Sequence, residues 1–356
     1  MSLNKKKKGK VIVAMSGGVD SSTVAAMLHE QDYEVVGVTL HLYTMQCKQN
    51  LHDAKIIADQ IGIPHYTHDY ESFFKKEIID DFVDTYTAGE TPNPCVKCNK
   101  NVKFGKLFEI AKDLGADALA TGHYVRKAKV DDADVLLKGI DKNKDQSYFL
   151  FAINKAQINF LKFPLGNLKK EETRQFAKKY GLTISNKPES QDICFASRGK
   201  YSQIVKKLRP EAHISGDIIL KNGEVLGRHD GIVNFTIGQR KKIGVSYNKP
   251  LYVIGIDAKN NKIIVGERDD LKASKLQMKN LNWLLKDKIL ESEIKCSVRL
   301  RSNHKEIGAT VKYLGDGYAD VILDDPYDGI TPGQACVMYD GDKLLGGGWI
   351  MKEGIK

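Results

Sequence analysis

Short apolar runs rich in β-branched residues alternate with helix-like segments in the first third of the chain. The β-rich runs lie at 10–15, 35–40, 64–67 and 118–123, and segments with helical spacing lie at 22–30, 51–61 and 104–114. Alternation of this kind predicts an α/β domain with a parallel sheet and helices on both faces. Ligands of such sheets bind at the carboxyl ends of the strands, so we expect the site at that edge.

The pattern changes character near residues 198–215. Beyond this stretch, short β-like runs are broken by turn formers, as at 221–223 and 340–342. This predicts two small β-rich domains after the α/β domain. We therefore divide the chain into a flexible basic tail at 1–9, a catalytic α/β domain at 10–205, a central β-rich domain at 206–277 and a β-barrel-like domain at 278–356.

Composition narrows the class of protein. No stretch of the chain approaches the roughly 20 apolar residues that a membrane-spanning helix needs. The lysine-rich N-terminus lacks the apolar region of a secretory signal, so we expect a cytoplasmic protein. The formal net charge of +10 suggests a polyanionic partner such as nucleic acid, with a solvated basic surface as the alternative.

A glycine-rich loop lies between the first β-rich run and the first helical segment. It reads Ser16, Gly17, Gly18, Val19, Asp20, Ser21 and Ser22. Glycines let the backbone approach a phosphate closely, and the helix start beyond them favours an anion. Asp20 adds a carboxylate that either holds a magnesium ion or orients the loop. The loop lacks the Walker A ending and resembles the PP-loop of N-type ATP pyrophosphatases, which cleave ATP between the α and β phosphates and adenylate a carbonyl oxygen.

Six cysteines are too few and too scattered for a disulfide framework; they are Cys47, Cys95, Cys98, Cys194, Cys296 and Cys336. Cys95 and Cys98 lie three positions apart in the segment 91–99, whose two prolines predict a stiff loop with exposed thiols. Cys194 lies in the motif 189–195. Three candidate ligands disfavour a structural zinc ion, which takes four.

Three motifs in this order resemble the bacterial tRNA-specific 2-thiouridylases: SGGVDSS at 16–22, TPNPCVKCNKNVKF at 91–104 and ESQDICF at 189–195. The resemblance continues through the runs at 121–124, 144–150, 235–240 and 331–335. It covers essentially the whole chain after Lys10. Each later motif is modest alone, while the ordered set is very specific. The resemblance implies an ATP-dependent tRNA-uridine 2-sulfurtransferase that forms 2-thiouridine.

The resemblance also assigns roles to residues. The loop 16–22 would bind ATP, with Leu40 and Gly122 near the nucleotide. Cys194 would carry a persulfide, and Cys98 would be its partner nucleophile. The residues around the target base would be Asn93, Pro94 and Cys95. The positions that match tRNA contacts of the family are His123, Lys144, Asp145, Gln146, Arg301, Ser302 and Gln334.

Three positions depart from the family pattern. Cys95 stands where the commonest version has an aspartate, so an acid/base or orienting role passes to the thiol, passes to another group or is unnecessary. Leu40 replaces a methionine, a mild change that still offers apolar packing to adenine. Ser302 stands where a tyrosine is frequent, which makes this tRNA contact the least defined of the set.

The implied chemistry begins with a poor leaving group, the oxygen of a uracil carbonyl. Adenylation by ATP solves this problem, and magnesium would offset the charge of the departing pyrophosphate. A persulfide on Cys194 then attacks directly, or Cys98 releases hydrosulfide from it and leaves a Cys98–Cys194 disulfide. Either route needs a thiolate, which we expect a basic cleft to favour by lowering the thiol pKa. The two cysteines must meet, so we expect a mobile loop.

Alternatives remain open at this point. Cys95, Cys98 and Cys194 could instead hold a [4Fe–4S] cluster whose open iron binds the sulfur. The chain could also be another PP-loop enzyme that needs no cysteine pair, or an RNA-binding module with a vestigial nucleotide site. For partners, the resemblance implies the wobble uridine of Lys, Glu and Gln tRNAs and a sulfur donor from a cysteine desulfurase pathway. We expect a monomer without membrane contact.

Overall fold

The computed structural model describes residues 7–42, 45–188, 193–196, 201–212, 214–285 and 293–356. The chain forms two compact units. The first combines Met1–Glu77, Cys95–Phe195 and Asp342–Leu344, and the second combines Ile78–Pro94, Ala196–Gly341 and Leu345–Lys356. The chain therefore changes unit immediately before Cys95 and immediately after Phe195. Residues 1–6 of the expected basic tail lie outside the described residues.

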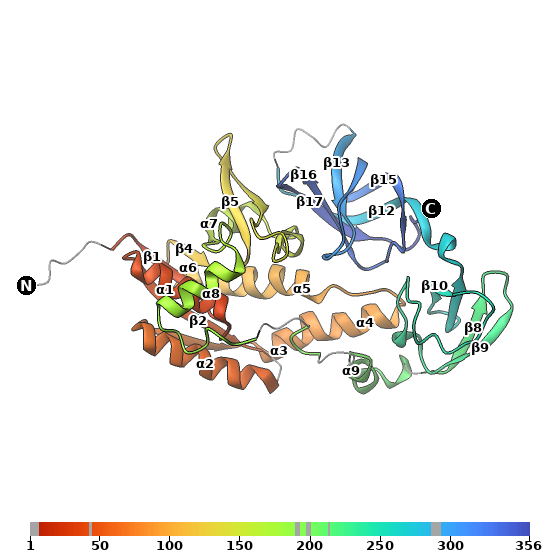
Figure 1. The fold of residues 1–356 in the computed structure, drawn as a ribbon, viewed down its shortest axis with the longest axis horizontal. Coiled ribbons are helices and arrows are strands. Elements are labelled where there is room, and N and C mark those ends of the chain that lie inside the picture. Colours follow the sequence, from red (N-terminus) through yellow and green to blue (C-terminus); the bar gives the residue numbers. More distant parts are fainter. Residues whose placement is uncertain (1–6, 43–44, 189–192, 197–200, 213, 286–292) are drawn as a thin grey trace, which may run out of the picture. The chain divides into compact units, whose positions relative to one another are not determined.

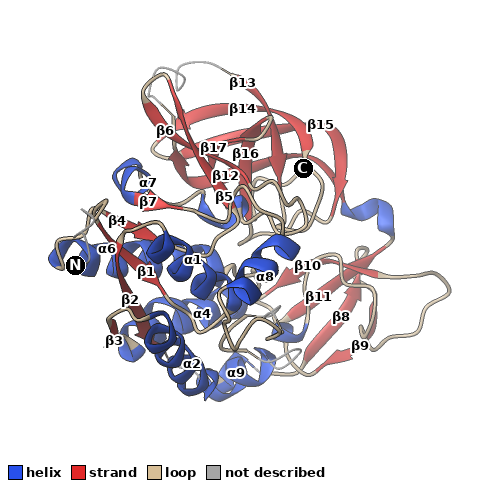
Figure 2. Ribbon diagram, turned by 60° about the vertical axis from the view of Figure 1, so that its left-hand side comes forward, coloured by secondary structure: helices blue, strands red, loops and turns tan. Residues whose placement is uncertain are grey.

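A five-stranded parallel sheet in the order β3-β2-β1-β4-β7 is the centre of the first unit. Its strands are β1 (Lys10–Ala14), β2 (Glu34–His41), β3 (His65–Asp69), β4 (Ala118–Ala120) and β7 (Leu161–Lys162). Ile12 and Val13 of the central strand β1 are fully buried. The predicted parallel sheet is confirmed; β1, β2 and β4 are labelled in Figure 1, and all of its strands are labelled in Figure 2.

Helices connect these strands. They are α1 (Val19–Glu30), α2 (Met45–Ile61), α3 (Glu71–Phe74), α5 (Pro94–Lys97), α6 (Leu107–Asp113), α7 (Lys155–Phe160) and α8 (Lys170–Lys179), with the π-helices η1 (Lys75–Asp80) and η2 (Cys98–Lys106) and the 3-10 helix η3 (Ser147–Leu150). α1 packs against α2 and α8. Right-handed crossovers place α1 and α2 on one face of the sheet and α6 on the other. A hairpin of β5 (Val125–Val130) and β6 (Ala133–Lys138) belongs to the same unit.

The second unit is rich in strands (Figure 2). A four-stranded sheet in the order β10-β11-β8-β9 consists of β8 (Gly216–Leu220), β9 (Val225–His229), β10 (Tyr252–Asp257) and β11 (Lys262–Gly266). An antiparallel ring in the order β12-β15-β14-β13-β16-β17 closes where β12 pairs with β17. Its strands are β12 (Lys272–Trp283), β13 (Ile294–Arg299), β14 (Ile307–Gly315), β15 (Tyr318–Asp328), β16 (Ala335–Asp340) and β17 (Lys343–Ile350). The closed ring confirms the predicted barrel.

The helices of the second unit explain why residues 78–94 belong to it. They are α4 (Asp81–Thr87), α9 (Tyr201–Leu208) and the 3-10 helices η4 (Pro210–Ala212), η5 (Ile232–Asn234) and η6 (Arg268–Leu271). Tyr86 of α4 stacks on Tyr201 of α9 with ring centroids 5.4 Å apart, and Arg209 pairs with Asp84 at 3.0 Å. Within the described ranges, no helix has the length and apolar character to cross a membrane.

Candidate active site

The glycine-rich loop connects β1 to α1 in the first unit. Gly17 has a φ of +67°, a conformation that glycine adopts without strain. Ser21 ties the loop together, because its Oγ accepts from the Ser16 backbone N–H at 3.1 Å and donates to the Gly18 carbonyl at 3.3 Å. The Ser22 Oγ is buried and has no hydrogen-bond partner among the described residues. A buried unpaired hydroxyl in the first turn of a helix fits a phosphate ligand.

Two further residues of the predicted nucleotide site flank this loop. β1 lies between β2 and β4, so the loop is at the switch point where α/β sheets bind ligands. Leu40 near the end of β2 is only 8% exposed. Gly122 follows β4, and a Cβ there would stand 2.9 Å from the Ser21 backbone nitrogen. The loop itself therefore requires glycine at position 122.

Asp20 orients the loop through a lysine that the sequence analysis missed. The Lys170 Nζ lies 2.6 and 2.8 Å from the two carboxylate oxygens of Asp20, and the Tyr124 hydroxyl donates to one of them at 2.9 Å. Lys170 lies on α8 and is 6% exposed. Of the two roles expected for Asp20, these contacts favour loop orientation, because an ammonium group occupies the place of a metal ion. Lys170 stands 150 positions from Asp20, so no local pattern reveals it.

Cys95 and Cys98 lie on a helix and not on the expected stiff loop. Pro94 takes the first position of α5, where its missing N–H costs no hydrogen bond, and η2 continues from Cys98. Cys95 is exposed, whereas Cys98 is buried. The expectation of two exposed thiols is therefore wrong for Cys98, because Val102 and Phe104 of η2 are fully buried and turn this part of the helix inward.

The thiols of Cys95, Cys98 and Cys194 lie within one another's electrostatic range. Burial raises the pKa of Cys98 to about 11 and that of Cys194 to about 12, and also raises the pKa of Cys95. The Lys103 ammonium lowers all three pKa values but does not offset burial. Cys95 and Cys194 are exposed when the whole residue is considered. Protein nevertheless surrounds their sulfur atoms, so burial is the largest influence on the pKa of each thiol. The expected lowering of the thiol pKa is therefore wrong.

Part of the Cys194 motif cannot be placed. Residues 189–192 of the motif 189–195 lie outside the described residues. Beyond Cys194, the Phe195 ring meets Phe74 edge-on with centroids 5.9 Å apart, and Ala196 is buried. Cys194 is therefore held from its C-terminal side by an aromatic contact within the first unit.

His123, one of the predicted tRNA contacts, is buried and packs against Phe104 of η2. Its Nδ1 shares a hydrogen bond with the Thr121 hydroxyl at 2.9 Å, and its ring lies 5.5 Å from that of Phe104. Burial, with a smaller contribution from the Lys103 charge, lowers the pKa of His123 well below its usual value. The imidazole is therefore neutral near pH 7.

The predicted tRNA contacts 144–146 form a turn before η3. Asp145 accepts from the Ser147 backbone N–H at 3.1 Å and from its hydroxyl at 2.9 Å. Gln146 accepts from the Tyr124 backbone N–H at 2.9 Å, and Lys144 is half-buried. The acceptors of Asp145 and Gln146 thus shape the turn, and Tyr124 links it to the Asp20 carboxylate.

The other predicted base and tRNA contacts lie in the second unit. Gln334 donates from Nε2 to the Thr91 carbonyl at 3.1 Å and the Pro92 carbonyl at 3.0 Å. Asn93 and Pro94, which follow directly, are both buried. Gln334 therefore holds the backbone that leads into Cys95.

Arg301 has a similar internal role. Its guanidinium donates to the Gly329 carbonyl at 2.9 Å, the Ile237 carbonyl at 3.2 Å and the Thr331 hydroxyl at 2.6 Å. These contacts join the four-stranded sheet region to the barrel within the second unit. Ser302 is half-buried and bonds only weakly to Asn303, at 3.5 Å.

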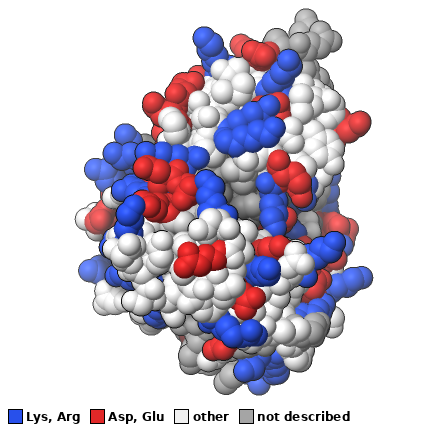
Figure 3. Space-filling model, turned by 90° about the vertical axis from the view of Figure 1, so that its right-hand side faces the viewer, with Lys and Arg blue, Asp and Glu red and all other residues white. Residues whose placement is uncertain are grey.

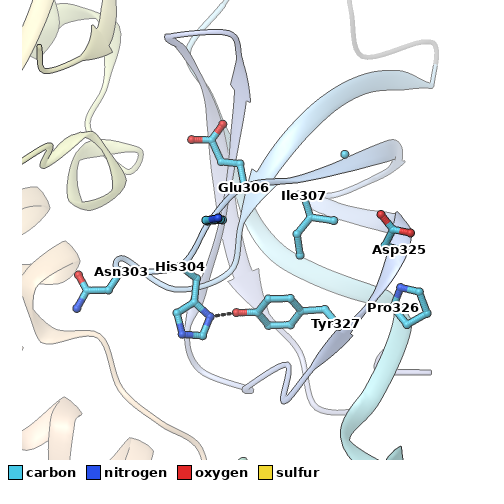
Figure 4. Close-up of a pocket in the computed structure, with 9 residues that line it drawn as sticks. Asn303, His304, Glu306, Ile307, Asp325, Pro326 and Tyr327 are labelled. Carbon is cyan, nitrogen blue, oxygen red and sulfur yellow. Dashed lines mark hydrogen bonds between the residues drawn. The ribbon is translucent and has the colours of Figure 1, made fainter. Parts of the chain in front are cut away.

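A separate pocket of about 560 Å³ begins directly after Ser302 (Figure 4). Residues 303–308, which lead into β14, and residues 325–327 of β15 line it. His304 hydrogen-bonds the Tyr327 hydroxyl across the pocket, while Glu306 accepts from Ser297 and Arg299. Burial lowers the pKa of His304. These polar groups are paired internally, so the pocket itself suggests no chemistry.

One group of metal-ligand side chains lies at the carboxyl edge of the parallel sheet. His41 ends β2 and stands opposite Asp69, which ends β3, with Glu71 two positions further. The ligand atoms of these three residues lie within 4.8 Å of one another. The Asp69 side chain is 72% exposed. The register of two strands brings the group together, so spacing along the sequence gives no sign of it.

Three family models match successive parts of the chain. Residues 9–198 match a tRNA methyl transferase HUP domain, residues 202–267 a tRNA methyl transferase PRC-barrel domain, and residues 273–350 an aminomethyltransferase beta-barrel domain. The chain is 49% identical over 358 residues to the tRNA-specific 2-thiouridylase MnmA of Rickettsia massiliae, which covers 98% of each chain. It is 48% identical over 358 residues to that of Orientia tsutsugamushi, covering 98% of this chain and 97% of the relative. The chain belongs to the tRNA-specific 2-thiouridylase family.

Membership of the 2-thiouridylase family confirms the resemblance inferred from the three motifs. The first unit contains the glycine-rich loop together with Cys95, Cys98 and Cys194. Sequence reasoning missed the lysines that serve these groups. Lys103 lies five positions after Cys98 in the sequence. Whether its charge acts on the thiols depends on the direction in which η2 turns its side chain, which the spacing does not give.

Proposed function

We propose that this protein is an ATP-dependent tRNA-uridine 2-sulfurtransferase that converts a wobble uridine to 2-thiouridine. One observation supports it most strongly: a phosphate-type loop at the switch point of the sheet and three mutually interacting thiols belong to the same unit. The loop suits the adenylation of a carbonyl oxygen, and the thiols suit sulfur transfer. PP-loop enzymes that form amides have no need of such thiols.

The first chemical step removes the leaving-group problem. The uridine 2-oxygen attacks the α-phosphorus of ATP, pyrophosphate leaves, and AMP is now bonded to that oxygen. Sulfur then attacks C2, and AMP departs with the former uridine oxygen. The loop 16–22 positions the phosphates for this attack through backbone N–H groups and the free Ser22 hydroxyl.

Sulfur reaches C2 from a persulfide on Cys194 by one of two routes. In the direct route the terminal sulfur attacks C2, and the Cys98 thiolate then attacks the Cys194 sulfur and releases 2-thiouridine. In the other route Cys98 attacks first and releases hydrosulfide, which attacks C2. Both routes end with a Cys98–Cys194 disulfide, and a dithiol reductant must restore the two thiols.

The raised pKa values bear on which sulfur is the nucleophile. With pKa values of about 11 and 12, Cys98 and Cys194 are protonated at neutral pH in the free protein. A persulfide is a stronger acid than the parent thiol, so loading sulfur onto Cys194 yields an anionic nucleophile where the thiol itself is inert. This favours the direct route for the first attack on C2.

Magnesium does not fit a site on Asp20. Both carboxylate oxygens of Asp20 accept from the Lys170 ammonium, at 2.6 and 2.8 Å. Magnesium would therefore arrive with ATP and be held by phosphate oxygens and water, its usual ligands in nucleotide complexes. The role of this ion is to offset the charge of the pyrophosphate.

A [4Fe–4S] cluster is the second candidate for handling sulfur. Cys95, Cys98 and Cys194 have the right donor chemistry and lie near one another, and a bound iron ion would deprotonate thiols that are otherwise neutral. Cys95→Asp, which restores the residue usual in the family, separates the two. The persulfide account predicts that Cys95→Asp stays active without iron. Stoichiometric iron in anaerobically purified protein, lost together with activity in this variant, would establish the cluster.

The remaining assignments follow from the resemblance and from charge. The substrate would be the wobble uridine of Lys, Glu and Gln tRNAs, with a sulfur carrier of a cysteine desulfurase pathway as donor and the cytoplasm as location. We expect a monomer, with residues 206–277 and 278–356 as separate tRNA-binding and barrel domains.

The net charge of +10 suits an RNA partner. On the face drawn in Figure 3, basic and acidic side chains are interspersed, so salt-sensitive RNA binding would rely on scattered lysines and arginines.

The test of this function is the mass of tRNA nucleosides after incubation with ATP, magnesium and a persulfide source. The wild type should form 2-thiouridine only when all three are present. Cys194→Ser and Cys98→Ser should form none, while Cys336→Ser, at a buried position in β16, should keep activity. ATP hydrolysis without tRNA thiolation would point to another PP-loop reaction. The absence of any ATP turnover would point to a pure RNA-binding module.

A further inference from the structure

We propose that Lys187 is a positioning residue of the ATP loop, and this inference rests on the proposed ATP-dependent function. The Lys187 Nζ donates to the Gly17 carbonyl at 2.9 Å and to the Asn50 side-chain oxygen at 3.1 Å. It also pairs with Asp53 at 2.6 Å. One ammonium group thus joins the loop to the first half of α2.

The contact with Gly17 determines where a neighbouring N–H points. In a trans peptide unit the carbonyl and the following N–H point in opposite directions. Holding the Gly17 carbonyl toward Lys187 therefore turns the Gly18 N–H away from it. A flipped peptide would present a carbonyl oxygen to the phosphate instead of an N–H donor, and would weaken anion binding.

Gly17 has little freedom to relax by other means. A Cβ at this position would overlap the Asn50 carbonyl oxygen at 2.2 Å, so α2 lies directly against the loop. The φ of Gly17 is +67°. Gly17 can leave this left-handed conformation only if an adjoining peptide unit rotates. Lys187 is the side chain that secures this close-packed peptide by hydrogen bonding.

Lys187 is itself held from α8. Arg174 donates to the Ser185 carbonyl at 2.7 Å and to the Lys187 carbonyl at 3.3 Å. One turn earlier on α8, Lys170 binds Asp20 at the other end of the loop. The contacts form a closed ring from the loop through Lys170, α8 and Arg174 to Lys187 and back to Gly17. A ring of this kind keeps the loop in shape before any ligand binds.

The test compares ligands that do and do not have phosphates. Lys187→Met should weaken ATP binding about tenfold, the loss expected when hydrogen bonds from a charged donor disappear. Adenosine lacks phosphates and should bind within about twofold of the wild type, because the adenine site is untouched. Calorimetric titration of the full chain measures both. A variant that loses both ligands equally, or neither, would overturn the proposal.

Two further variants make the test specific. Lys179→Met removes an exposed ion pair with Glu30 at the far end of α8 and should change neither affinity. Asp53→Asn removes an anchor of Lys187 and should also weaken ATP binding, measured in about 0.5 M salt so that the field of the deleted charge is screened. Tighter ATP binding by Asp53→Asn would mean that Lys187 binds phosphate directly, and would overturn the positioning role.

Failure of this inference and failure of the proposed function give different results. If the wild type forms 2-thiouridine while Lys187→Met keeps the wild-type ratio of ATP to adenosine affinity, only the inference falls. If the wild type forms no 2-thiouridine, the function falls whatever that ratio is. Lys187→Arg guards against misfolding, since it keeps a charged donor and should bind ATP more tightly than Lys187→Met.

Discussion

Cys98, the partner nucleophile of Cys194 in the proposed function, lies at a buried position on η2. Its pKa is raised to about 11, so the free protein keeps this thiol protonated and protected from oxidation. Lys103 reaches Cys95, Cys98 and Cys194 alike with its charge. At the scale of single residues, thiol reactivity therefore depends on two opposing effects on the pKa: burial raises it, and the Lys103 charge lowers it.

Replacing Lys103 should make the thiols still less reactive. Lys103→Met removes the charge that lowers the pKa of Cys98, so alkylation of Cys98 at pH 8 should slow by about three- to tenfold, the effect of a pKa rise of up to one unit. Peptide mass spectrometry after timed treatment with iodoacetamide measures this. Lys100→Met, at an exposed position of the same helix, is the matched control. An unchanged rate in Lys103→Met would contradict the electrostatic role.

The same thiols should show a distinctive pH dependence. Only the thiolate reacts. At pH values below the pKa, the thiolate fraction rises about tenfold for each unit by which the pH increases. Because the pKa of Cys98 is raised to about 11, its alkylation rate should climb from pH 7 to pH 10 without a plateau. A plateau near pH 8 or 9 would show an unperturbed thiol.

Motifs were sufficient to nominate Cys98, Cys194 and the loop 16–22 as site residues, because thiols and a glycine-rich loop indicate their chemistry by residue type alone. They could not predict that Cys98 is buried, since burial depends on how η2 packs. They also could not predict Lys170 or Lys187, whose partners lie at positions 20 and 17. Long-range ion pairs leave no trace in local spacing.

At the scale of elements, the site depends on the order of strands. β1 separates β2 from β4, which brings Leu40 and Gly122 to the two sides of the ATP loop. The β-rich runs at 10–15, 35–40, 64–67 and 118–123 were predictable because buried parallel strands are continuously apolar. The helix that begins at Pro94 was not, since proline is as typical of a loop as of the first turn of a helix.

Gly122→Ala should disturb the ATP loop from the side of β4. The new methyl group would stand 2.9 Å from the Asp20 Cβ and from the Ser21 backbone nitrogen, so the loop must shift. Overpacking of this kind costs about 1–3 kcal/mol, which corresponds to a loss of ATP affinity of roughly fivefold to 150-fold. Calorimetry with ATP checks this, and tRNA affinity should stay within about twofold. Unchanged ATP affinity would contradict the close packing.

At the scale of the whole molecule, the chain changes unit at two places that matter for the chemistry. One lies between Pro94 and Cys95, and the other between Phe195 and Ala196, next to Cys194. The sequence suggested consecutive domains, whereas residues 78–94 belong to the second unit. That interleaving depends on contacts such as Gln334 with Thr91, which are 243 positions apart.

Gln334→Ala should reveal what holding the segment before Cys95 contributes to the reaction. It removes two hydrogen bonds to the backbone at Thr91 and Pro92, worth about 1 kcal/mol each. Thiolation should slow by roughly tenfold if the segment before Cys95 loses its position. Filter binding of tRNA separates this from direct recognition. An affinity for tRNA that falls as much as the rate would assign Gln334 to tRNA contact.

The most direct test of the account follows one oxygen atom. A tRNA whose wobble uridine has ¹⁸O at C2 is incubated with the enzyme, ATP, magnesium and a persulfide source. The masses of AMP, pyrophosphate and the tRNA nucleosides are then determined by mass spectrometry. Adenylation of the uridine oxygen predicts one ¹⁸O in AMP for every 2-thiouridine formed. Formation of 2-thiouridine with unlabelled AMP, or with the label in pyrophosphate, would contradict the proposed mechanism.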